Sequence, residues 1–325
     1  MTEKLKERFC KDTKLSIKVF AEPYFSERIA LMGKEEEWKE FVKLIETRFE
    51  NDEQKYFEAY NHLKDDIIDY IKSSDAFKDL NARDMNEFNV MTNVQEGDVF
   101  KEPYIGHRFI SIDLAKANFS ALVAYGKEYN CPFGNDNYSW TDFVNMFTDV
   151  DYFAKSKYIR QVVFGNCNPK RQMKYEKVLI NRLFNQIVEK TNDVSNYDVY
   201  SMFISTRLRR HCNDELVFDA DGLTENQIIE FKKIVEDIAD IPIHFEYFEL
   251  YKVAGTRAFV KKIMPLKNME SVEYELKCCN ALDTILTLKK LKNIPLEEDD
   301  KVFMSEFGLA KLLDLPEVKI DNGRR

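Results

Sequence analysis

The sequence predicts an α+β fold built on a split βαββαβ, or ferredoxin-like, arrangement. The prediction rests on the order of β-prone runs and amphipathic helices in the middle of the chain. In chain order these segments are a strand at 109–113, a helix at 170–190, strands at 198–205 and 216–218, a helix at 224–238 and a strand at 243–253. This order of strand, helix, strand, strand, helix and strand is typical of the ferredoxin-like fold.

The regions on either side of this unit are expected to be mainly helical. Apolar residues recur with helical spacing at 35–49 and at 54–71, so two amphipathic helices are predicted before a turn at Gln95–Asp98. After the unit, a helix is predicted at 275–291. The expected division is therefore a helical region at 1–105, the βαββαβ unit at 106–268 and a helical region at 269–325.

Composition excludes several classes of protein. The chain has 325 residues, of which 44% are hydrophobic and 32% charged, and no run approaches the roughly 18 apolar residues of a membrane span. Residues 1–14 lack the apolar segment of a signal peptide, and the six cysteines lack zinc-site spacing. A cytoplasmic protein without a membrane partner is expected. Motifs typical of P-loop ATPases, dinucleotide-binding enzymes, serine hydrolases and zinc proteases are absent from the sequence.

One segment concentrates basic charge although the net charge is −9. Residues 155–182 contain eight Lys or Arg against a single carboxylate, Glu176. A local basic groove for phosphates is one interpretation, and a solvated helix face is the other. The candidate contacts to a triphosphate or a nucleic-acid backbone are Lys157, Arg160, Lys170 and Arg171.

Three carboxylates occupy positions suited to metal-dependent chemistry. Asp113 ends the first predicted strand, and Asp214 with Glu215 lies at the tip of the central hairpin. The first and third strands of a split βαβ unit are neighbours, so these side chains are expected to converge. Two-metal nucleotidyl transfer needs such carboxylates from separate strands. Asp113, Asp214 and Glu215 are therefore predicted to be catalytic residues and ligands of Mg²⁺ or Mn²⁺. The alternatives are a structural Asp at a strand end and ordinary hairpin polarity.

Three motifs resemble those of reverse transcriptases and related palm-domain polymerases. Residues 113–120 (DLAKANFS) resemble the first palm motif, in which an apolar strand ends on an Asp. Residues 165–169 (GNCNP) before a long helix resemble the Gly-containing loop of the second. Residues 212–218 (CNDELVF) are similar to the hairpin that carries Tyr-x-Asp-Asp, although Cys212 replaces the Tyr and Glu215 the second Asp. In addition, Arg207–Arg210 is expected to lengthen the hairpin turn.

The resemblance implies a palm at 106–268, a fingers-like region before it and a thumb-like region after it. It also implies that Asn118, Phe119 and Gly165 contact the nucleotide. Asn118 stands where reverse transcriptases carry the aromatic side chain that excludes a ribose 2′-hydroxyl, so acceptance of ribonucleotides is expected. The segment 156–172 also looks like uncharacterised proteins of large DNA viruses, which implies a viral or phage origin.

The sequence therefore predicts a nucleotidyltransferase or polymerase that transfers nucleotides from NTP or dNTP to a hydroxyl acceptor. Its expected partners are nucleotide triphosphates and nucleic acid. One alternative is a non-catalytic palm or ferredoxin-like module that binds nucleic acid or a protein partner. Another is a cyclase or guanylyltransferase that uses the same metal residues on a different substrate.

Overall fold

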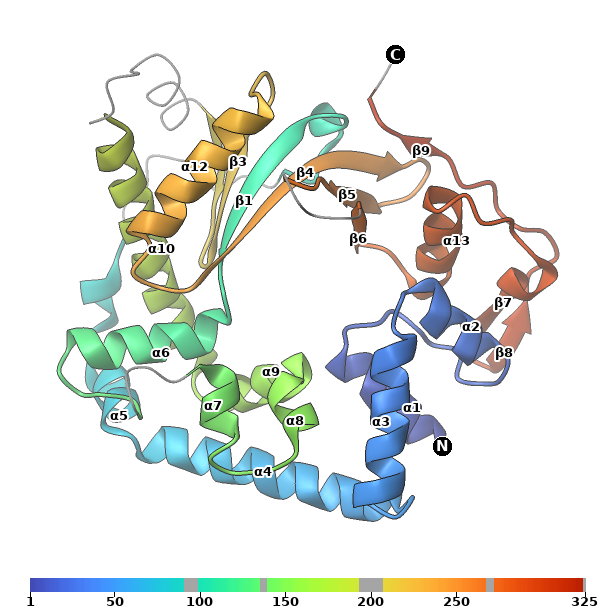
Figure 1. The fold of residues 1–325 in the computed structure, drawn as a ribbon, viewed down its shortest axis with the longest axis horizontal. Helices are drawn as coiled ribbons and strands as arrows, with labels where there is room; N and C mark the ends of the chain where they lie inside the picture. The colour runs from blue at the N-terminus through green and yellow to red at the C-terminus, as the bar shows by residue number, and fades with distance from the viewer. Residues whose placement is uncertain (91–98, 135–138, 193–206, 267–271, 324–325) are drawn as a thin grey trace.

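An antiparallel sheet with helices forms the centre of the protein, which confirms the α+β class. The computed structural model describes residues 1–90, 99–134, 139–192, 207–266 and 272–323 (Figure 1). The sheet order is β2-β3-β1-β4-β5-β6, and β9 pairs with β4. The strands are β1 (Arg108–Leu114), β2 (Leu208–His211), β3 (Glu215–Asp219), β4 (Ile243–Val253), β5 (Phe259–Ile263), β6 (Glu273–Lys277) and β9 (Ile320–Asp321).

The N-terminal region is helical, as the apolar periodicity predicts. Its helices are α1 (Glu3–Asp12), α2 (Tyr24–Leu31), α3 (Glu35–Arg48), α4 (Glu53–Ser73) and α5 (Asp75–Ala82), followed by the short 3₁₀ helices η1 (Met85–Phe88) and η2 (Glu102–Tyr104). Asp52 caps α4 by accepting hydrogen bonds from the backbone N–H groups of Gln54 and Lys55. Phe41 and Tyr56, both fully buried, pack edge to face between α3 and α4. The turn predicted at Gln95–Asp98 lies outside the described residues.

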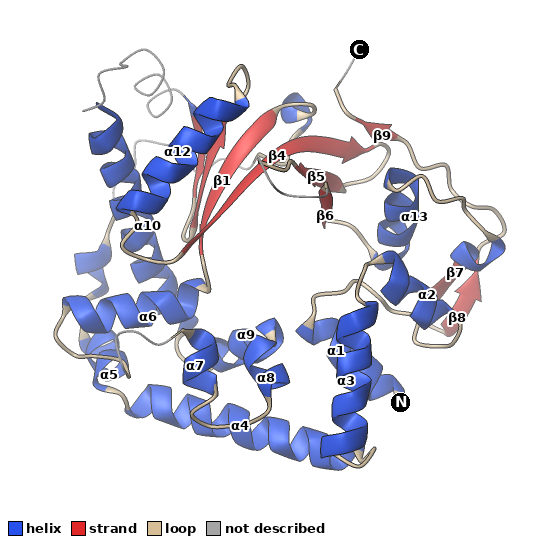
Figure 2. Ribbon diagram, viewed as in Figure 1, coloured by secondary structure: helices blue, strands red, loops and turns tan. Residues whose placement is uncertain are grey.

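A run of helices separates β1 from the central hairpin. It comprises α6 (Ala117–Glu128), α7 (Trp140–Val144), α8 (Asp151–Lys155), α9 (Lys157–Gly165) and α10 (Pro169–Asn192). Ser139 begins α7 through a capping box with Asp142. α12 (Glu225–Ile238), capped by Thr224 and Gln227, follows the hairpin and leads into β4. Two of these helices, α10 and α12, lie together on one side of the sheet (Figure 2).

The two faces of the sheet have different environments because side chains alternate along each strand. Ile110, Ile112 and Leu114 of β1 lie in the main core, which also contains the buried residues of α10 and α12. Phe109 points to the other face, where it belongs to a small cluster with Val217 and Phe248. On this second face, Asp113 of β1 and Glu215 of β3 lie opposite each other, at the end of β1 near Leu114.

The central hairpin differs from the sequence prediction. Residues 207–212 are not a long basic turn, because Leu208–His211 forms β2 and pairs with β3. The run of arginines obscured a strand whose ends, Leu208 and His211, are buried. The turn itself is short, and the backbone N–H of Cys212 donates to the carbonyl of Glu215 at 3.0 Å. The strand predicted at 198–205 lies outside the described residues.

The C-terminal region contains more strand than predicted. The helix expected from residue 275 begins only at Ala281, where Asn280 caps α13 (Ala281–Leu291). Residues 273–277 instead form β6, because this segment completes the backbone hydrogen bonds of β5. A 3₁₀ turn, η3 (Glu298–Lys301), precedes a hairpin of β7 (Val302–Ser305) and β8 (Gly308–Lys311).

The C-terminal region packs against the N-terminal helices, so the chain closes into a ring-like arrangement (Figure 1). Leu31 of α2 clusters with Ile285 and Leu288 of α13. The Lys292 ammonium group donates to the carbonyl of Leu31 at 2.6 Å, and Arg28 donates to the carbonyl of Val302 at 2.6 Å. Among the described residues, no helix is both long enough and apolar enough to cross a membrane.

Candidate functional site

Asp113 lies at the centre of a row of polar side chains across three strands. In the strand register it is directly opposite Glu215 on β3 and His244 on β4. Residues paired in this way point to the same face of a sheet. Asp113, Glu215 and His244 therefore share the face opposite α10 and α12. The β-prone sequence of residues 109–113 fixes this placement, since each alternate residue must enter the core.

Asp214 is held beside the end of β1 by the short turn of the central hairpin. The backbone N–H of Leu114 donates to the carbonyl of Asp214 at 2.8 Å. The Cys212 thiol lies 3.7 Å from Oδ1 of Asp214. The convergence of Asp113 with the Asp214–Glu215 pair, expected from the strand order, is thus present in the structure.

A further carboxylate, Glu176 of α10, joins this group. Its side chain is only 3% exposed, and Asn118 Nδ2 donates to its Oε1 at 2.7 Å. Sequence reasoning treated Glu176 only as the exception within a basic run. A signal was present, because Gln172, Glu176, Leu179 and Ile180 share the buried side of α10. A glutamate on the buried side of a helix needs a partner or a function.

The carboxylates of this group repel one another. Burial raises the pKa of Asp113 to about 7, and the charges of Asp214 and Glu215 add to this effect. Burial likewise raises the pKa of Glu176 to about 7, with Asp214 as the next largest cause. Such crowding favours binding of a cation, because a cation would offset both the desolvation and the mutual repulsion.

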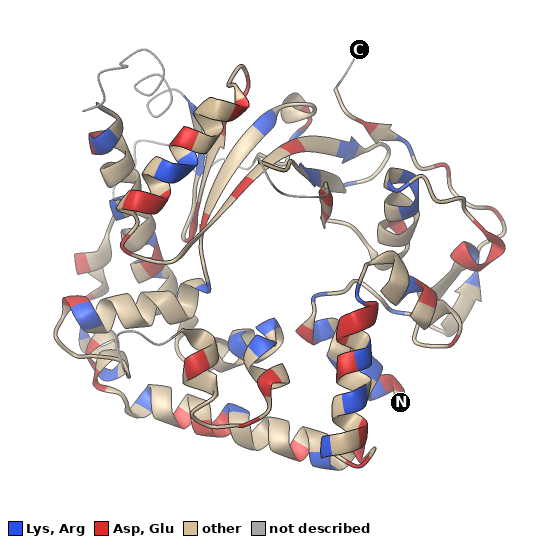
Figure 3. Cartoon of the chain, in the orientation of Figure 1, with Lys and Arg blue, Asp and Glu red and all other residues tan. Residues whose placement is uncertain are grey.

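Cationic side chains on α9 lie near these carboxylates. Lys157 and Arg160 interact electrostatically with Asp113, and burial lowers the pKa of Arg160 while Asp113 opposes that shift. Ile159 and Val163 anchor the buried side of α9. Lys14, after α1, lies near Lys157, and its pKa falls to about 8 through burial and then through the positive charge of Lys157. In Figure 3, Lys and Arg are coloured blue on α9, and Asp and Glu are coloured red along the strands of the sheet.

Glu215 already has protein partners. Ser111 Oγ donates to its Oε1 at 2.7 Å, and Arg210 Nε lies 3.3 Å from its Oε2. These contacts compensate the charge of Glu215. They leave Asp113 and Asp214 as the carboxylates best placed to accept a cation, with Glu215 supporting the group from β3.

Four other predicted contact residues have different surroundings. Phe119 is 4% exposed and packs against Phe133, Trp140 and Phe143 in an aromatic cluster. Arg171 Nη1 donates to the carbonyls of Leu80 and Arg83, both at 2.9 Å. Phe119 therefore packs α6 against neighbouring helices, and Arg171 ties α10 to the segment around Leu80 and Arg83.

The other two, Gly165 and Lys170, are exposed at the junction of α9 and α10. A side chain at Gly165 would meet no neighbouring atom, so the fold does not require glycine there. None of the described contacts of Phe119, Gly165, Lys170 or Arg171 reaches Asp113 or Asp214.

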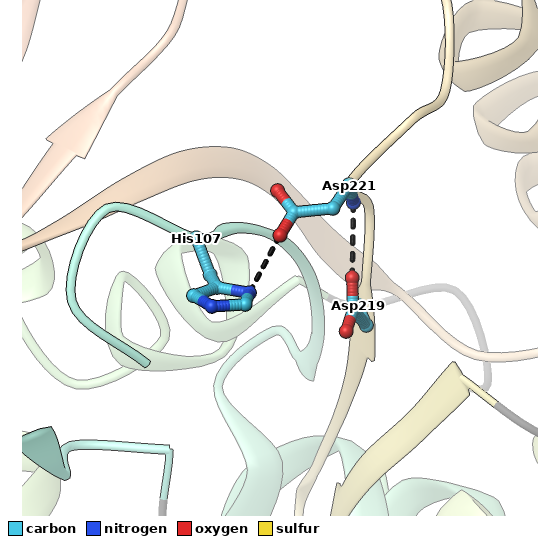
Figure 4. A group of neighbouring side chains, drawn as sticks. All are labelled: His107, Asp219 and Asp221. Carbon is cyan, nitrogen blue, oxygen red and sulfur yellow. Dashed lines mark hydrogen bonds and ion pairs between the residues drawn. The ribbon is translucent and has the colours of Figure 1, made fainter. Parts of the chain in front are cut away.

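A second group of potential metal ligands lies at the other end of the same strands. His107, Asp219 and Asp221 each offer a ligand atom within 4.8 Å of the others (Figure 4). His107 Nδ1 lies 2.5 Å from Asp221 Oδ2. However, Arg209 lies 3.0 Å from Asp219, and Arg207 donates to the carbonyl of Asp221 at 2.6 Å. These arginines oppose a cation, so the group is best described as an ion-pair cluster.

The Asp113 group offers donors suited to a hard divalent cation, although His107, Asp219 and Asp221 are the only group of three among the described residues whose ligand atoms all lie within 4.8 Å of one another. Its donors are carboxylate oxygens, which Mg²⁺ and Mn²⁺ prefer, and two of them carry raised pKa values. The sequence and the structure were also compared with known proteins. No protein family, curated protein or solved structure matches the chain.

Proposed function

We propose that the protein is a palm-type nucleotidyltransferase that joins a nucleotide from an NTP or dNTP to a hydroxyl acceptor. The observation that carries this proposal is the convergence of Asp113 with Asp214 at the adjoining ends of β1 and β3, with Lys157 and Arg160 of α9 close enough to interact electrostatically with Asp113. Carboxylates beside cationic side chains suit a substrate that is itself a metal-bound polyphosphate.

The topology supports a palm. Strands β2, β3, β1 and β4 are antiparallel and adjacent in that order, which is the order of a βαββαβ unit. α10 and α12 occupy the positions of its two helices. In the chain, α6 to α9 are inserted between β1 and α10, and in the sheet, β5 and β6 lie beyond β4. In a palm, both would be additions to the βαββαβ unit.

The residues divide the work of the reaction. Asp113 and Asp214 would hold Mg²⁺ or Mn²⁺, which neutralises phosphate charge and lowers the pKa of the attacking hydroxyl when bound. Lys157 and Arg160 bind the β- and γ-phosphates. The acceptor oxygen forms a bond to the α-phosphorus, and the bond to the β-phosphate oxygen breaks, so pyrophosphate leaves with its charge neutralised by these cations.

Asn118, held in place by the buried Glu176, would contact the ribose. The Asn118 amide keeps its carbonyl oxygen as an acceptor while its Nδ2 donates to Glu176. A ribose 2′-hydroxyl could donate to this oxygen, whereas an aromatic side chain at the same position would exclude it. This arrangement supports acceptance of ribonucleotides.

A non-catalytic module that binds nucleic acid or a protein partner is the second candidate. The ion pair of Glu215 with Arg210 favours it, because a carboxylate that is already neutralised is a weaker metal ligand. The two candidates differ in one requirement: only the enzyme needs a divalent cation to hold the triphosphate.

Binding of a fluorescent ATP analogue with and without Mn²⁺ tests the proposal. We expect Mn²⁺ to tighten binding to the wild type and not to Asp113→Ala or Asp214→Ala. Asp237→Ala, at an exposed position of α12, is the matched control and should behave as wild type. Nucleotide binding that is equal with and without Mn²⁺, and equal in all variants, would favour the non-catalytic module.

A further inference from the structure

A cavity of about 680 Å³ lies beside α6, outside the carboxylate group. This volume is within the range of pockets that enclose small organic ligands. Four separate parts of the chain form it: one side of α6, the start of α7, Arg182 of α10 and the α12–β4 connection. α6, α7 and the α12–β4 connection lie next to one another in Figure 1. The shape of the cavity is therefore a product of tertiary packing.

The interior of the cavity is mainly apolar. Phe119, Val123 and Ala124 of α6 form one wall, and Trp140 and Ile241 form the others. Phe119, Trp140 and Ile241 are 4%, 1% and 8% exposed, so they belong to the packed interior behind the surface of the cavity. Among the described residues, the indole N–H of Trp140 has no hydrogen-bond acceptor. The walls favour an apolar occupant.

The rim of the cavity carries positive charge. Lys116 and Lys127 both line it, and no carboxylate of the described residues forms an ion pair with either. Arg182, Glu128 and Asp240 also line the rim, where Arg182 lies 2.6 Å from Glu128 and 3.9 Å from Asp240, so the three cations of the rim exceed its two carboxylates by one charge. Burial, and then the nearby Arg160, lowers the pKa of Lys116, as expected where cations outnumber carboxylates. An anionic group on the occupant would find two lysines at this rim.

We propose that the cavity is a binding site for a small amphipathic anion, with an apolar body against Val123 and Ala124 and its acidic group between Lys116 and Lys127. The inference does not depend on nucleotide chemistry. It nevertheless reaches the carboxylate group, because α6 carries Phe119 on the cavity wall and Asn118 in contact with Glu176. An occupant is thus positioned to alter the placement of Asn118.

The probe for this site is 8-anilinonaphthalene-1-sulfonate, an apolar anion whose fluorescence can be excited by energy transfer from tryptophan. The chain has two tryptophans, Trp38 and Trp140, so a Trp38→Phe background leaves Trp140 as the only donor. We expect saturable binding of one probe per chain, with energy transfer. The uncharged analogue N-phenyl-1-naphthylamine should bind several-fold more weakly.

Two variants test the location. Ala124→Phe fills the cavity and should weaken probe binding at least about tenfold. Lys127→Glu changes only an exposed rim charge, so it should fold as wild type and weaken binding several-fold. Lys155→Glu, exposed on α8, is the matched charge control and should leave binding unchanged. Absence of saturable binding would overturn the proposal, as would binding that both Ala124→Phe and Lys127→Glu leave unchanged in folded protein, as judged by circular dichroism.

Discussion

Asn118 on α6 donates a 2.7 Å hydrogen bond to the buried carboxylate of Glu176 on α10. This contact joins the helix that follows Asp113 to the long helix behind the central hairpin. It therefore links a residue singled out in the sequence to one that the sequence did not single out. In the proposed enzyme, the pair determines which sugar is accepted.

Replacing Asn118 with Phe should convert the protein to an enzyme that excludes ribonucleotides. The ring would occupy the space of a 2′-hydroxyl and remove its hydrogen-bond acceptor. We expect the ratio of kcat/KM for NTP over dNTP to fall by about 10- to 200-fold. Asn118→Asp, which preserves side-chain size, should change this ratio less. Equal exclusion of ribonucleotides by the wild type and Asn118→Phe would contradict the assignment.

The stability of the metal-free protein should fall as the pH rises through the range in which Asp113 ionises. The folded chain holds this proton up to about pH 7, whereas an unperturbed carboxyl releases it near 3.8. The folded state thus binds more protons across this window, so the free energy of unfolding decreases from about pH 4 to about pH 7.

Asp113→Asn should remove part of this pH dependence. Thermal unfolding monitored by circular dichroism should give a Tm at least about 2 °C above that of the wild type at about pH 8, with a smaller difference at about pH 5. Mg²⁺ should raise the Tm of the wild type at the higher pH and not that of Asp113→Asn. Asp237→Asn is the control for loss of an exposed carboxylate. A Tm difference that is the same at both pH values would count against the raised pKa.

The α9 cations should affect nucleotide affinity. Lys157→Ala and Arg160→Ala each remove a charged hydrogen-bond donor, which corresponds to a rise in KM of about 10- to 100-fold. Lys155→Ala changes an exposed lysine two residues away from Lys157 and should leave KM unchanged. Initial-rate kinetics at several salt concentrations measure these KM values. A rise in KM that Lys155→Ala shares would indicate only a general effect of basic charge.

Arg171 should affect stability and not substrate binding. It donates to the carbonyls of Leu80 and Arg83, so Arg171→Ala leaves two acceptors without this donor. We expect the free energy of unfolding to fall by about 1–3 kcal/mol, measured by urea titration. Lys170→Ala, at the exposed neighbouring position, should change it little. A rise in nucleotide KM for Arg171→Ala at unchanged stability would restore the role in phosphate binding expected from the sequence.

The parts of the fold that were predictable depend on local patterns. In α3 and α4, apolar residues recur with the helical period on the buried face, and in β1 they recur with the strand period. Such periodicity can be detected in the sequence of each segment alone. β2 was not predictable in this way. Its arginines are favourable in a turn, and only pairing with β3 makes Leu208–His211 a strand. β6 was mistaken for the start of a helix for a similar reason, because β5 supplies its hydrogen bonds.

The site was predictable only where residues are close to a strand end or a turn. Asp113, Asp214 and Glu215 could be placed together from strand order alone, but Glu176 reaches them across the packing of α10 on the sheet. Arg171 and Phe119 show the opposite relationship between residue type and tertiary environment. Their residue types suit nucleotide binding, yet tertiary contacts with Leu80 and Trp140 occupy them.

The most direct test of the central claim is incorporation of each labelled NTP and dNTP, with Mg²⁺ or Mn²⁺ and with or without nucleic-acid templates. The wild type should form product, and Asp113→Ala and Asp214→Ala should not. Asp221→Ala, in the ion-pair cluster at the other end of the strands, should retain activity. Absence of product from the wild type under every condition, or equal product from Asp113→Ala and Asp214→Ala, would contradict the proposed function.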